Sequence, residues 1–342
     1  MNRFLIFRLS SLGDIIHTLP AFAALRSAHL DSHITWVVEE NGKEILDLVP
    51  GLDRIVVVQA KQWKWHTHGF RREVSRLLNE IRDREQVAID FQGLLKSGLL
   101  AGLSRARQRV GFHKADLREP LASIFYTQRA DRFPENQHVI FKNLNLLNCL
   151  GIREDRLVFP LELPNALQAY VLEKLQSLGF NGRAKLVVVN VGAAWDTKRW
   201  TSDKWTALIQ KLKSLDIFPV LLWGTEIEKE LAEEISADSG ISMMPFLPIK
   251  EVMALLKSAD LLVSGDTFAL QAACALSRPV VALFGPTNPK RNGPFLEADK
   301  TAFHPLDCSY CYQRACPDLK CMAALQPEEV AHLCRERLEE HA

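Results

Sequence analysis

The first polar residues of the chain interrupt an apolar run in a way that suits chemistry. The stretch "FLIFRLSSLGDIIHTLP", residues 4–20, passes from strand-like sequence through serines and a glycine to Asp14, and then becomes helix-like. Ser11 and Gly13 leave room for a ligand beside the backbone, and a carboxylate there can act as general base for a hydroxyl nucleophile. An aspartate that only caps a helical turn would occupy the same place, and both interpretations remain open.

Four cysteines form a second group with possible chemistry. They lie in "CSYCYQRACPDLKC" with C-x₂-C-x₄-C-x₄-C spacing: Cys308, Cys311, Cys316 and Cys321. Four thiols so close together can bind a structural zinc ion or an iron–sulfur cluster. The spacing matches neither common zinc folds nor a ferredoxin pattern. Free thiols in a loop and a disulfide are the alternatives.

Short apolar runs rich in β-branched residues alternate with helical patterns along the chain. The expected strands are 4–7, 33–38, 54–58, 87–90, 185–190, 218–223, 261–264 and 280–284. Such alternation is typical of βαβ units with parallel sheets covered on both faces. Among the helices, we expect the first to be capped by Thr18 with Pro20 in its first turn.

The alternation pauses between about residues 131 and 183, where prolines accumulate. We therefore predict an α/β protein with two doubly wound, Rossmann-like domains, 1–160 and 161–325, facing each other across a cleft. Residues 326–342 form a terminal helix that can return to the first domain. Ligands of such sheets bind at the carboxyl ends of the strands.

Charge is unevenly distributed although the formal net charge is only +1. Residues 61–129 contain 14 Lys and Arg against 7 Asp and Glu, which favours an anionic partner or a solvated basic face. No signal peptide and no apolar run of membrane-spanning length is visible. We expect a cytoplasmic protein.

Several common motifs are absent from the sequence. It contains no G-x-x-x-x-G-K-[ST], G-x-G-x-x-G, G-x-S-x-G or H-E-x-x-H, which argues against a P-loop NTPase, a standard dinucleotide dehydrogenase, an α/β-hydrolase and a zincin. It also lacks Asp-x-Asp, so a bound diphosphate would be neutralised by helix N-termini and basic side chains. No motif of nucleic-acid binding accompanies the basic region, and we expect no nucleic-acid partner.

Several spaced motifs, taken in order, resemble glycosyltransferase family 9, the ADP-heptose:lipopolysaccharide heptosyltransferases. "SSLGDIIHTLPA" is similar to the family's opening motif, and "WVVEE", "IDFQGLLKSG" and "REPLASIFY" resemble its heptosyltransferase I members most. "GAAWDTKRW", "LLWGTEIE", "SGDT" and "LFGPTNP" are similar to its donor-site motifs. The resemblance covers nearly the whole chain. It implies the GT-B architecture and heptose transfer with inversion from ADP-heptose to the Kdo of the inner core.

The resemblance also implies a role for each matching residue. Asp14 would be the general base, and Lys198 would stabilise the charge of the departing diphosphate. No metal or other cofactor would be required for catalysis. The residues expected to bind the donor are Gly192, Trp223, Glu228, Asp266, Thr267 and Gln271. Independently of the family, a helix that begins near Asp266 or Thr267 would point free N–H groups at an anion.

Acceptor contacts are expected on the first domain, because its basic residues suit the Kdo carboxylate and the lipid A phosphates. With such an acceptor, the resemblance also implies that the protein can lie on the cytoplasmic face of the inner membrane. The candidates are Ser11, Gly13, Lys61, Lys64, Gln92, Lys96 and Arg118. The sequence departs from the family pattern D-T-G-x-x-H, because Phe268 and Gln271 replace the glycine and the histidine. A family member with another nucleotide sugar or acceptor, or a non-catalytic relative that binds sugar nucleotide or lipid, therefore remains an alternative.

Overall fold

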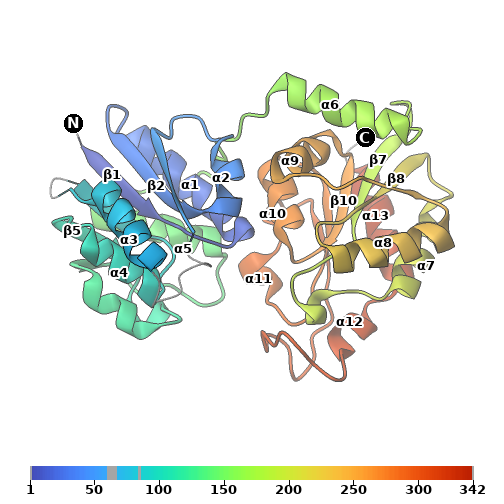
Figure 1. The fold of residues 1–342 in the computed structure, drawn as a ribbon. Helices are drawn as coiled ribbons and strands as arrows, with labels where there is room; N and C mark the ends of the chain where they lie inside the picture. The colour runs from blue at the N-terminus through green and yellow to red at the C-terminus, as the bar shows by residue number, and fades with distance from the viewer. Residues whose placement is uncertain (1, 60–67, 84–85, 341–342) are drawn as a thin grey trace. The chain divides into compact units, whose positions relative to one another are not determined.

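Two compact units make up the structure, a computed structural model that describes residues 2–59, 68–83 and 86–340 (Figure 1). The first unit is Met1–Glu162 and the second is Leu163–Ala342. Each unit contains one six-stranded sheet whose strands all pair in parallel. The prediction of an α/β fold with two doubly wound sheets is confirmed.

In the first unit the strand order is β3-β2-β1-β4-β5-β6. The strands are β1 (Arg3–Phe7), β2 (His33–Glu39), β3 (Arg54–Val58), β4 (Gln86–Asp90), β5 (Gln108–Gly111) and β6 (Gln128–Arg129). Central strand β1 is buried except at its first residue, because it has neighbours on both sides and helices on both faces. Strands β5 and β6 were not predicted, since both are short and rich in polar residues.

Helices cover both faces of this sheet (Figure 1). They are α1 (Leu12–Ala28), α2 (Glu40–Leu46), α3 (His68–Ile81), α4 (Leu95–Leu103) and α5 (Val139–Leu146), with 3₁₀ turns η2 (Lys114–Asp116), η3 (Pro120–Phe125) and η4 (Leu147–Leu150). The predicted cap at Thr18 is wrong. Helix α1 begins six residues earlier with Ser11 at its N-cap, and Thr18 donates its hydroxyl hydrogen to the Asp14 carbonyl inside the helix. Pro20 also lies inside the helix.

The second sheet has the order β12-β11-β10-β7-β8-β9. Its strands are β7 (Lys185–Asn190), β8 (Ile217–Leu222), β9 (Ser242–Met243), β10 (Leu261–Gly265), β11 (Val280–Leu283) and β12 (Lys300–Ala302). Numbered within its own unit, this is the same order as in the first sheet. In both sheets, therefore, the first and fourth strands in chain order lie side by side, and the order reverses between them. This topological switch point is where ligands of open α/β sheets bind.

The helices of the second unit include the last one of the chain. They are α6 (Asn165–Ser177), η5 (Asp196–Lys198), α7 (Ser202–Leu212), α8 (Glu226–Ser239), α9 (Ile249–Ser258), α10 (Phe268–Ala275), α11 (Pro289–Asn292), α12 (Lys320–Ala324) and α13 (Pro327–Glu339). The sequence allowed this terminal helix to return to the first domain. In the structure α13 packs on α7 and β12, and Val330, Cys334 and Leu338 join the core of the second unit.

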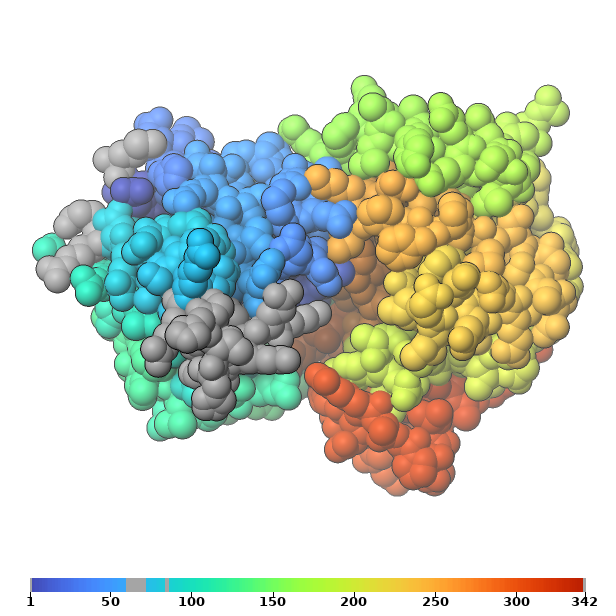
Figure 2. Space-filling view, viewed as in Figure 1, coloured from blue at the N-terminus to red at the C-terminus, as the bar shows by residue number. Residues whose placement is uncertain are grey.

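Residues 305–318, which carry three of the clustered cysteines, lie mostly at the surface of the second unit. In Figure 2 the red C-terminal part stands out at the lower edge of that unit. Within the described ranges, no helix combines the length and the apolarity needed to cross a membrane.

Candidate active site

Two candidate residues of each unit follow the strands that meet at its switch point. In the first unit β1 lies beside β4, with Phe7 opposite Asp90, so the segments that follow these strands are adjacent. In the second unit β7 lies beside β10, with Asn190 opposite Ser264. Asp14 follows β1 and Gln92 follows β4, whereas Lys198 follows β7 and Asp266 follows β10. The fold thus brings together, within each unit, residues that are far apart in the sequence.

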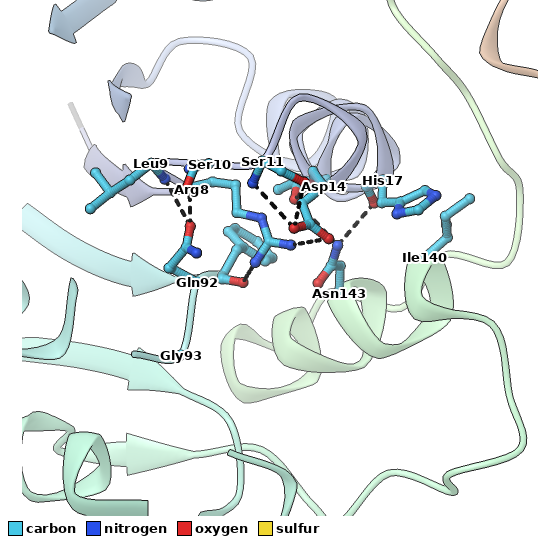
Figure 3. Close-up of polar contacts among 12 residues, drawn as sticks. Arg8, Leu9, Ser10, Ser11, Asp14, His17, Gln92, Gly93, Ile140 and Asn143 are labelled. Carbon is cyan, nitrogen blue, oxygen red and sulfur yellow. Dashed lines mark hydrogen bonds and ion pairs between the residues drawn. The ribbon is translucent and has the colours of Figure 1, made fainter. Parts of the chain in front are cut away.

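Asp14 lies in the first turn of α1, and its geometry is compatible with both functions considered for it (Figure 3). Its Oδ2 accepts hydrogen bonds from the Ser11 backbone N–H at 3.2 Å and the Ser11 hydroxyl at 3.0 Å, so it caps the helix. Its Oδ1 lies 2.8 Å from an Arg8 nitrogen, yet 40% of the side chain remains exposed. The carboxylate is therefore fixed in position and still open to a small molecule.

The charge state of Asp14 results from opposing effects. Burial among protein atoms favours the neutral acid and raises the pKa. The positive charges of Arg8 and His17 and the hydrogen bonds from Ser11 outweigh burial, and the net pKa of Asp14 lies below its ordinary value. The group is consequently a carboxylate at neutral pH and can accept a proton.

Arg8 is the partner that the sequence analysis missed. Its side chain is only 8% exposed, and it donates hydrogen bonds to Asp14 and to the Phe91 carbonyl oxygen. Its Nε is buried without a hydrogen-bond partner among the described residues. The available signal was a single arginine that closes the apolar strand six residues before Asp14.

Gln92, predicted to bind the acceptor, holds the loop that leads to Asp14. Its Oε1 accepts the backbone N–H groups of Leu9 at 3.0 Å and Ser10 at 3.2 Å (Figure 3). Gly13, another predicted acceptor residue, lies next to Asp14 in the first turn of α1 and is partly buried. The polar segments after β1 and β4 are therefore tied to each other by a side chain, and Gln92 influences the position of Asp14 whether or not it touches a ligand.

Behind this loop lies a buried polar network that the sequence did not reveal. Asp90 is fully buried and accepts hydrogen bonds from the Ser97 hydroxyl at 2.8 Å and the Tyr126 hydroxyl at 2.7 Å. It also accepts the N–H groups of Gln92 and Gly93. Burial raises the pKa of Asp90 despite these bonds, and it raises the pKa of Tyr126 as well. This network fixes the start of the segment that carries Gln92.

The other acceptor candidates are less closely grouped. Lys96 forms an ion pair with Glu39 at 2.8 Å, which places it beside the carboxyl end of β2. Arg118 is exposed just before η3. Lys61 and Lys64 lie outside the described residues.

In the second unit Lys198 and Asp266 form one shielded pair. The Lys198 ammonium lies 2.7 Å from Asp266 Oδ2, and the side chains are only 14% and 9% exposed. Thr287 donates its hydroxyl hydrogen to the same carboxylate oxygen at 2.8 Å. The ammonium also lies 4.3 Å from the centre of the Trp195 ring. A phosphate can therefore bind the Lys198 ammonium only by displacing Asp266 or by sharing the ammonium with it.

Thr267 is the N-cap of α10, which confirms the predicted helix start. Its hydroxyl lies 3.2 Å from the Asn190 amide nitrogen and 3.0 Å from the Ser264 hydroxyl. The first residue of α10, Phe268, is half-buried. Gln271 is buried, and its amide donates to the Asn292 carbonyl oxygen at 2.7 Å. The two departures from the family pattern therefore differ, because Gln271 bonds to the last residue of α11 whereas Phe268 lies at the N-terminus of α10.

Glu228 and Gly192 lie against each other. Glu228 Oε2 accepts the backbone N–H groups of Gly224 at 2.9 Å and Thr225 at 3.0 Å, as the third residue of α8 in a capping box. A Cβ atom at position 192 would lie 2.2 Å from Glu228 Cδ, so a larger residue there would displace the Glu228 side chain. Trp223 is buried, and its indole N–H donates to the Met244 carbonyl oxygen.

The prediction of a metal site at the cysteine cluster is not supported. Cys308, Cys311 and Cys316 are exposed and Cys321 is partly exposed, all as free thiols. In the part of the chain that the structure describes, no three His, Cys, Asp or Glu side chains gather closely enough to hold a metal ion. Sequence spacing brings the thiols near one another along the chain, but the loop does not converge them on one point.

Comparisons with known proteins bear directly on these two sites. The sequence model described as "Glycosyltransferase family 9 (heptosyltransferase)" matches residues 74–322. Lipopolysaccharide heptosyltransferase 1 of Pseudomonas aeruginosa is 31% identical, over 96% of both chains. Lipopolysaccharide heptosyltransferase 1 of Escherichia coli K12 is 28% identical, over 84% of this chain and 89% of the relative.

Solved structures agree with the sequence comparisons. The E. coli heptosyltransferase WaaC with ADP has a TM-score of 0.80 at 25% identity, over 99% of this chain and all of that one. WaaC with ADP-2-deoxy-2-fluoro heptose has a TM-score of 0.77 over the same shares. The predicted GT-B architecture is thereby confirmed. With the family model matched over most of its length, this chain belongs to glycosyltransferase family 9, the heptosyltransferases.

Proposed function

We propose that this protein transfers heptose from ADP-heptose to the Kdo of the lipopolysaccharide inner core, with inversion and with Asp14 as general base. The observation that carries the proposal is the ionised, partly exposed Asp14 carboxylate at the switch point of the first unit. Relatives named lipopolysaccharide heptosyltransferase 1 and WaaC structures with ADP and a heptose analogue support the donor and the pathway.

The acceptor half of the reaction needs a base whose position is fixed. In an inverting displacement the acceptor hydroxyl attacks the anomeric carbon while ADP leaves from the opposite face, through an oxocarbenium-like transition state. Asp14 takes the hydroxyl proton as the new bond forms. Arg8 and Ser11 orient the carboxylate, and the depressed pKa keeps it unprotonated at neutral pH.

The donor half needs positive charge where the diphosphate leaves. Lys198 supplies an ammonium group, and the N-terminus of α10 supplies backbone N–H groups next to the Thr267 hydroxyl. Asp266 would meet sugar hydroxyls and Glu228 the ribose, as in the family pattern. Growing negative charge on the leaving diphosphate then draws Lys198 away from Asp266, which makes the contact stronger in the transition state than in the ground state.

The anionic acceptor matches the basic character of the first unit. Arg118 is exposed, Gln92 follows β4, and Lys96 forms an ion pair with Glu39 at the carboxyl end of β2. These side chains, with Lys61 and Lys64, would contact the Kdo carboxylate and the lipid A phosphates. Because lipid A resides in a bilayer, the enzyme would work at the cytoplasmic face of the inner membrane.

An ADP-release assay with ADP-heptose and Kdo₂-lipid A tests the proposal. We expect Asp14→Asn to lose about 10²–10⁴-fold in kcat, the usual contribution of a general base, with little change in KM for ADP-heptose. Asp31→Asn, which removes an exposed carboxylate just beyond α1, is the matched control and should retain full activity. Wild-type turnover by Asp14→Asn would disprove the role of the base.

Phe268 favours a second candidate, in which a family 9 transferase uses another nucleotide sugar. A bulky side chain at the N-terminus of α10 narrows the approach of a phosphate or sugar compared with glycine. Turnover with a different nucleotide sugar, but none with ADP-heptose, would establish this alternative. Binding of ADP-heptose without turnover in any acceptor assay would instead indicate a non-catalytic relative.

A further inference from the structure

Four large apolar side chains are exposed on two elements that pack against each other in the first unit, α4 and η3. Leu95 and Leu99 of α4 are 42% and 38% exposed, and Leu121 and Ile124 of η3 are 65% and 66% exposed. We call these four residues the α4–η3 patch. Single exposed apolar residues are ordinary in soluble proteins, but a group on neighbouring elements is typical of an interaction surface.

The exposed face of η3 is held firmly in place. Ring atoms of Phe125 come so close to Gly98 and Gly102 that an added Cβ would lie 3.2 Å and 2.9 Å from them. Arg109 donates to the Phe125 carbonyl oxygen at 2.6 Å, and Arg129 donates to that of Ser123 at 2.7 Å. Leu121 and Ile124 are therefore presented to solvent by an anchored turn.

Spacing places the patch residues on outward faces. In a 3₁₀ turn residues three apart lie above one another, so Leu121 and Ile124 share a face that differs from the one used by Phe125. Leu95 and Leu99 are four apart and share a face of α4. The opposite face of α4 carries Leu100, which is buried in the core of the first unit. The exposed leucines consequently point away from the sheet.

Positive charge predominates in the chain segment that carries this apolar group. Residues 95–132 contain eight Lys and Arg against three Asp and Glu. Arg105, Arg107, Lys114 and Arg118 are exposed in the segments that flank α4 and η3. A protein partner would not require such an excess, whereas exposed apolar side chains accompanied by basic ones are typical of proteins that lie on anionic lipid.

We propose that the α4–η3 patch docks on an anionic lipid bilayer, with Leu121 and Ile124 inserted among the lipids and the flanking cations on their phosphates. This docking surface rests on the proposed function, since an acceptor attached to lipid A lies in a bilayer and the enzyme must approach that bilayer to use it. Its test does not need turnover, so the docking surface and the transferase activity can fail independently.

Sedimentation with vesicles of phosphatidylglycerol and phosphatidylcholine measures the docking directly. Leu121→Ser with Ile124→Ser should weaken vesicle binding by roughly tenfold or more, because apolar area no longer enters the lipid. Arg107→Glu and Lys114→Glu should each weaken it by about fivefold, and only when phosphatidylglycerol is present. Ile227→Ser and Phe246→Ser, which change exposed apolar residues of the second unit, are the matched controls and should bind like the wild type.

Two further measurements separate docking from other effects. With a water-soluble Kdo acceptor, Leu121→Ser/Ile124→Ser should retain wild-type kcat, which also shows that it folds. Unchanged vesicle binding by this variant would overturn the proposal. The proposal would also be overturned if analytical ultracentrifugation showed a dimer for the wild type and a monomer for this variant, because the patch would then be a contact between copies of the chain.

Discussion

The two units share one strand order, but they handle charge at the switch point differently. In the first unit a buried cation, Arg8, holds an acid that remains open to solvent, Asp14. In the second unit both members of the pair, Lys198 and Asp266, are shielded. In the first unit a ligand can therefore contact the negative charge of Asp14 directly. In the second unit the charges of Lys198 and Asp266 nearly cancel, and a ligand must draw the two groups apart to use either one.

This difference is consistent with the function proposed for each site. A general base must keep a free oxygen for the incoming proton, so its counter-charge lies behind it. A cation that serves a leaving diphosphate has to be compensated before the donor arrives, because an unpaired buried charge is costly. In the proposed function, the same fold therefore provides a preformed base in the first unit and a cation released by substrate in the second.

Beyond Asp14→Asn, the largest expected effect comes from removing the shielded cation. Lys198→Met should lower kcat by about 10²–10³-fold, the usual cost of losing one group that stabilises developing negative charge. It also leaves the Asp266 carboxylate without its counter-charge, which should lower the free energy of unfolding by about 3–5 kcal/mol. ADP release and urea denaturation measure the two effects separately.

A double variant tests whether these effects have different origins. Lys198→Met combined with Asp266→Asn should regain most of the stability, since no unpaired charge remains, but it should stay inactive. Recovery of turnover in the double variant would mean that the lysine only neutralises Asp266, and the comparison between the units would then fail.

Arg8→Gln should change the pH dependence of the reaction. Burial raises the pKa of Asp14, and without the Arg8 charge that opposes it, the pKa of this carboxyl should be higher than in the wild type. The acid limb of the kcat/KM profile should move to higher pH by the same amount. An unchanged acid limb would show that Arg8 does not control Asp14.

Arg8→Gln should also change how the free energy of unfolding depends on pH. A depressed carboxyl pKa stabilises the wild type above the pKa of the unfolded chain, and this contribution is lost as the pH falls through the lower folded-state value. Arg8→Gln should therefore lose stability at neutral pH and less at strongly acidic pH, as measured by urea denaturation at several pH values.

The sequence predicted the fold well where strands are long and apolar. All four buried strands of each sheet that were expected are present, whereas β5, β6, β9 and β12 were missed, since they have four residues or fewer and little apolar pattern. The start of α1 was misplaced because Thr18 and Pro20 resemble a helix start. The spacing of Ser11 and Asp14 carried the correct signal, a serine followed three residues later by an acid.

The sites were less predictable because their contacts join distant segments. Lys198 and Asp266 were each identified, but nothing local indicates that residues 68 positions apart form an ion pair. Asp90 was read as the end of a strand, and its partner Tyr126 comes from a different segment. The sequence could thus predict which polar residues follow the strands. Which of them form ion pairs or hydrogen bonds with each other could be seen only in the structure.

A smaller effect is expected from the tie between the two loops of the first unit. Gln92→Ala removes the oxygen that accepts the Leu9 and Ser10 N–H groups, so the loop before Asp14 should shift. We expect kcat to fall by roughly tenfold, because a small misplacement of a reacting group is costly. Gln92→Glu keeps an accepting oxygen and is the matched control. If the alanine variant instead raises only the KM for the acceptor, Gln92 acts by touching the acceptor.

The smallest effect should come from the glycine beside the capping acid in the second unit. Gly192→Ala places a Cβ atom where Glu228 Cδ now lies, so the carboxylate must leave the N–H groups of Gly224 and Thr225. Loss of this cap should cost about 1 kcal/mol of stability. If Glu228 also holds the donor ribose, the KM for ADP-heptose should rise severalfold while kcat changes little, and Glu228→Ala should behave alike. A wild-type KM in both variants would restrict Glu228 to helix capping, and the second unit would then bind its donor through the Lys198–Asp266 side of the switch point alone.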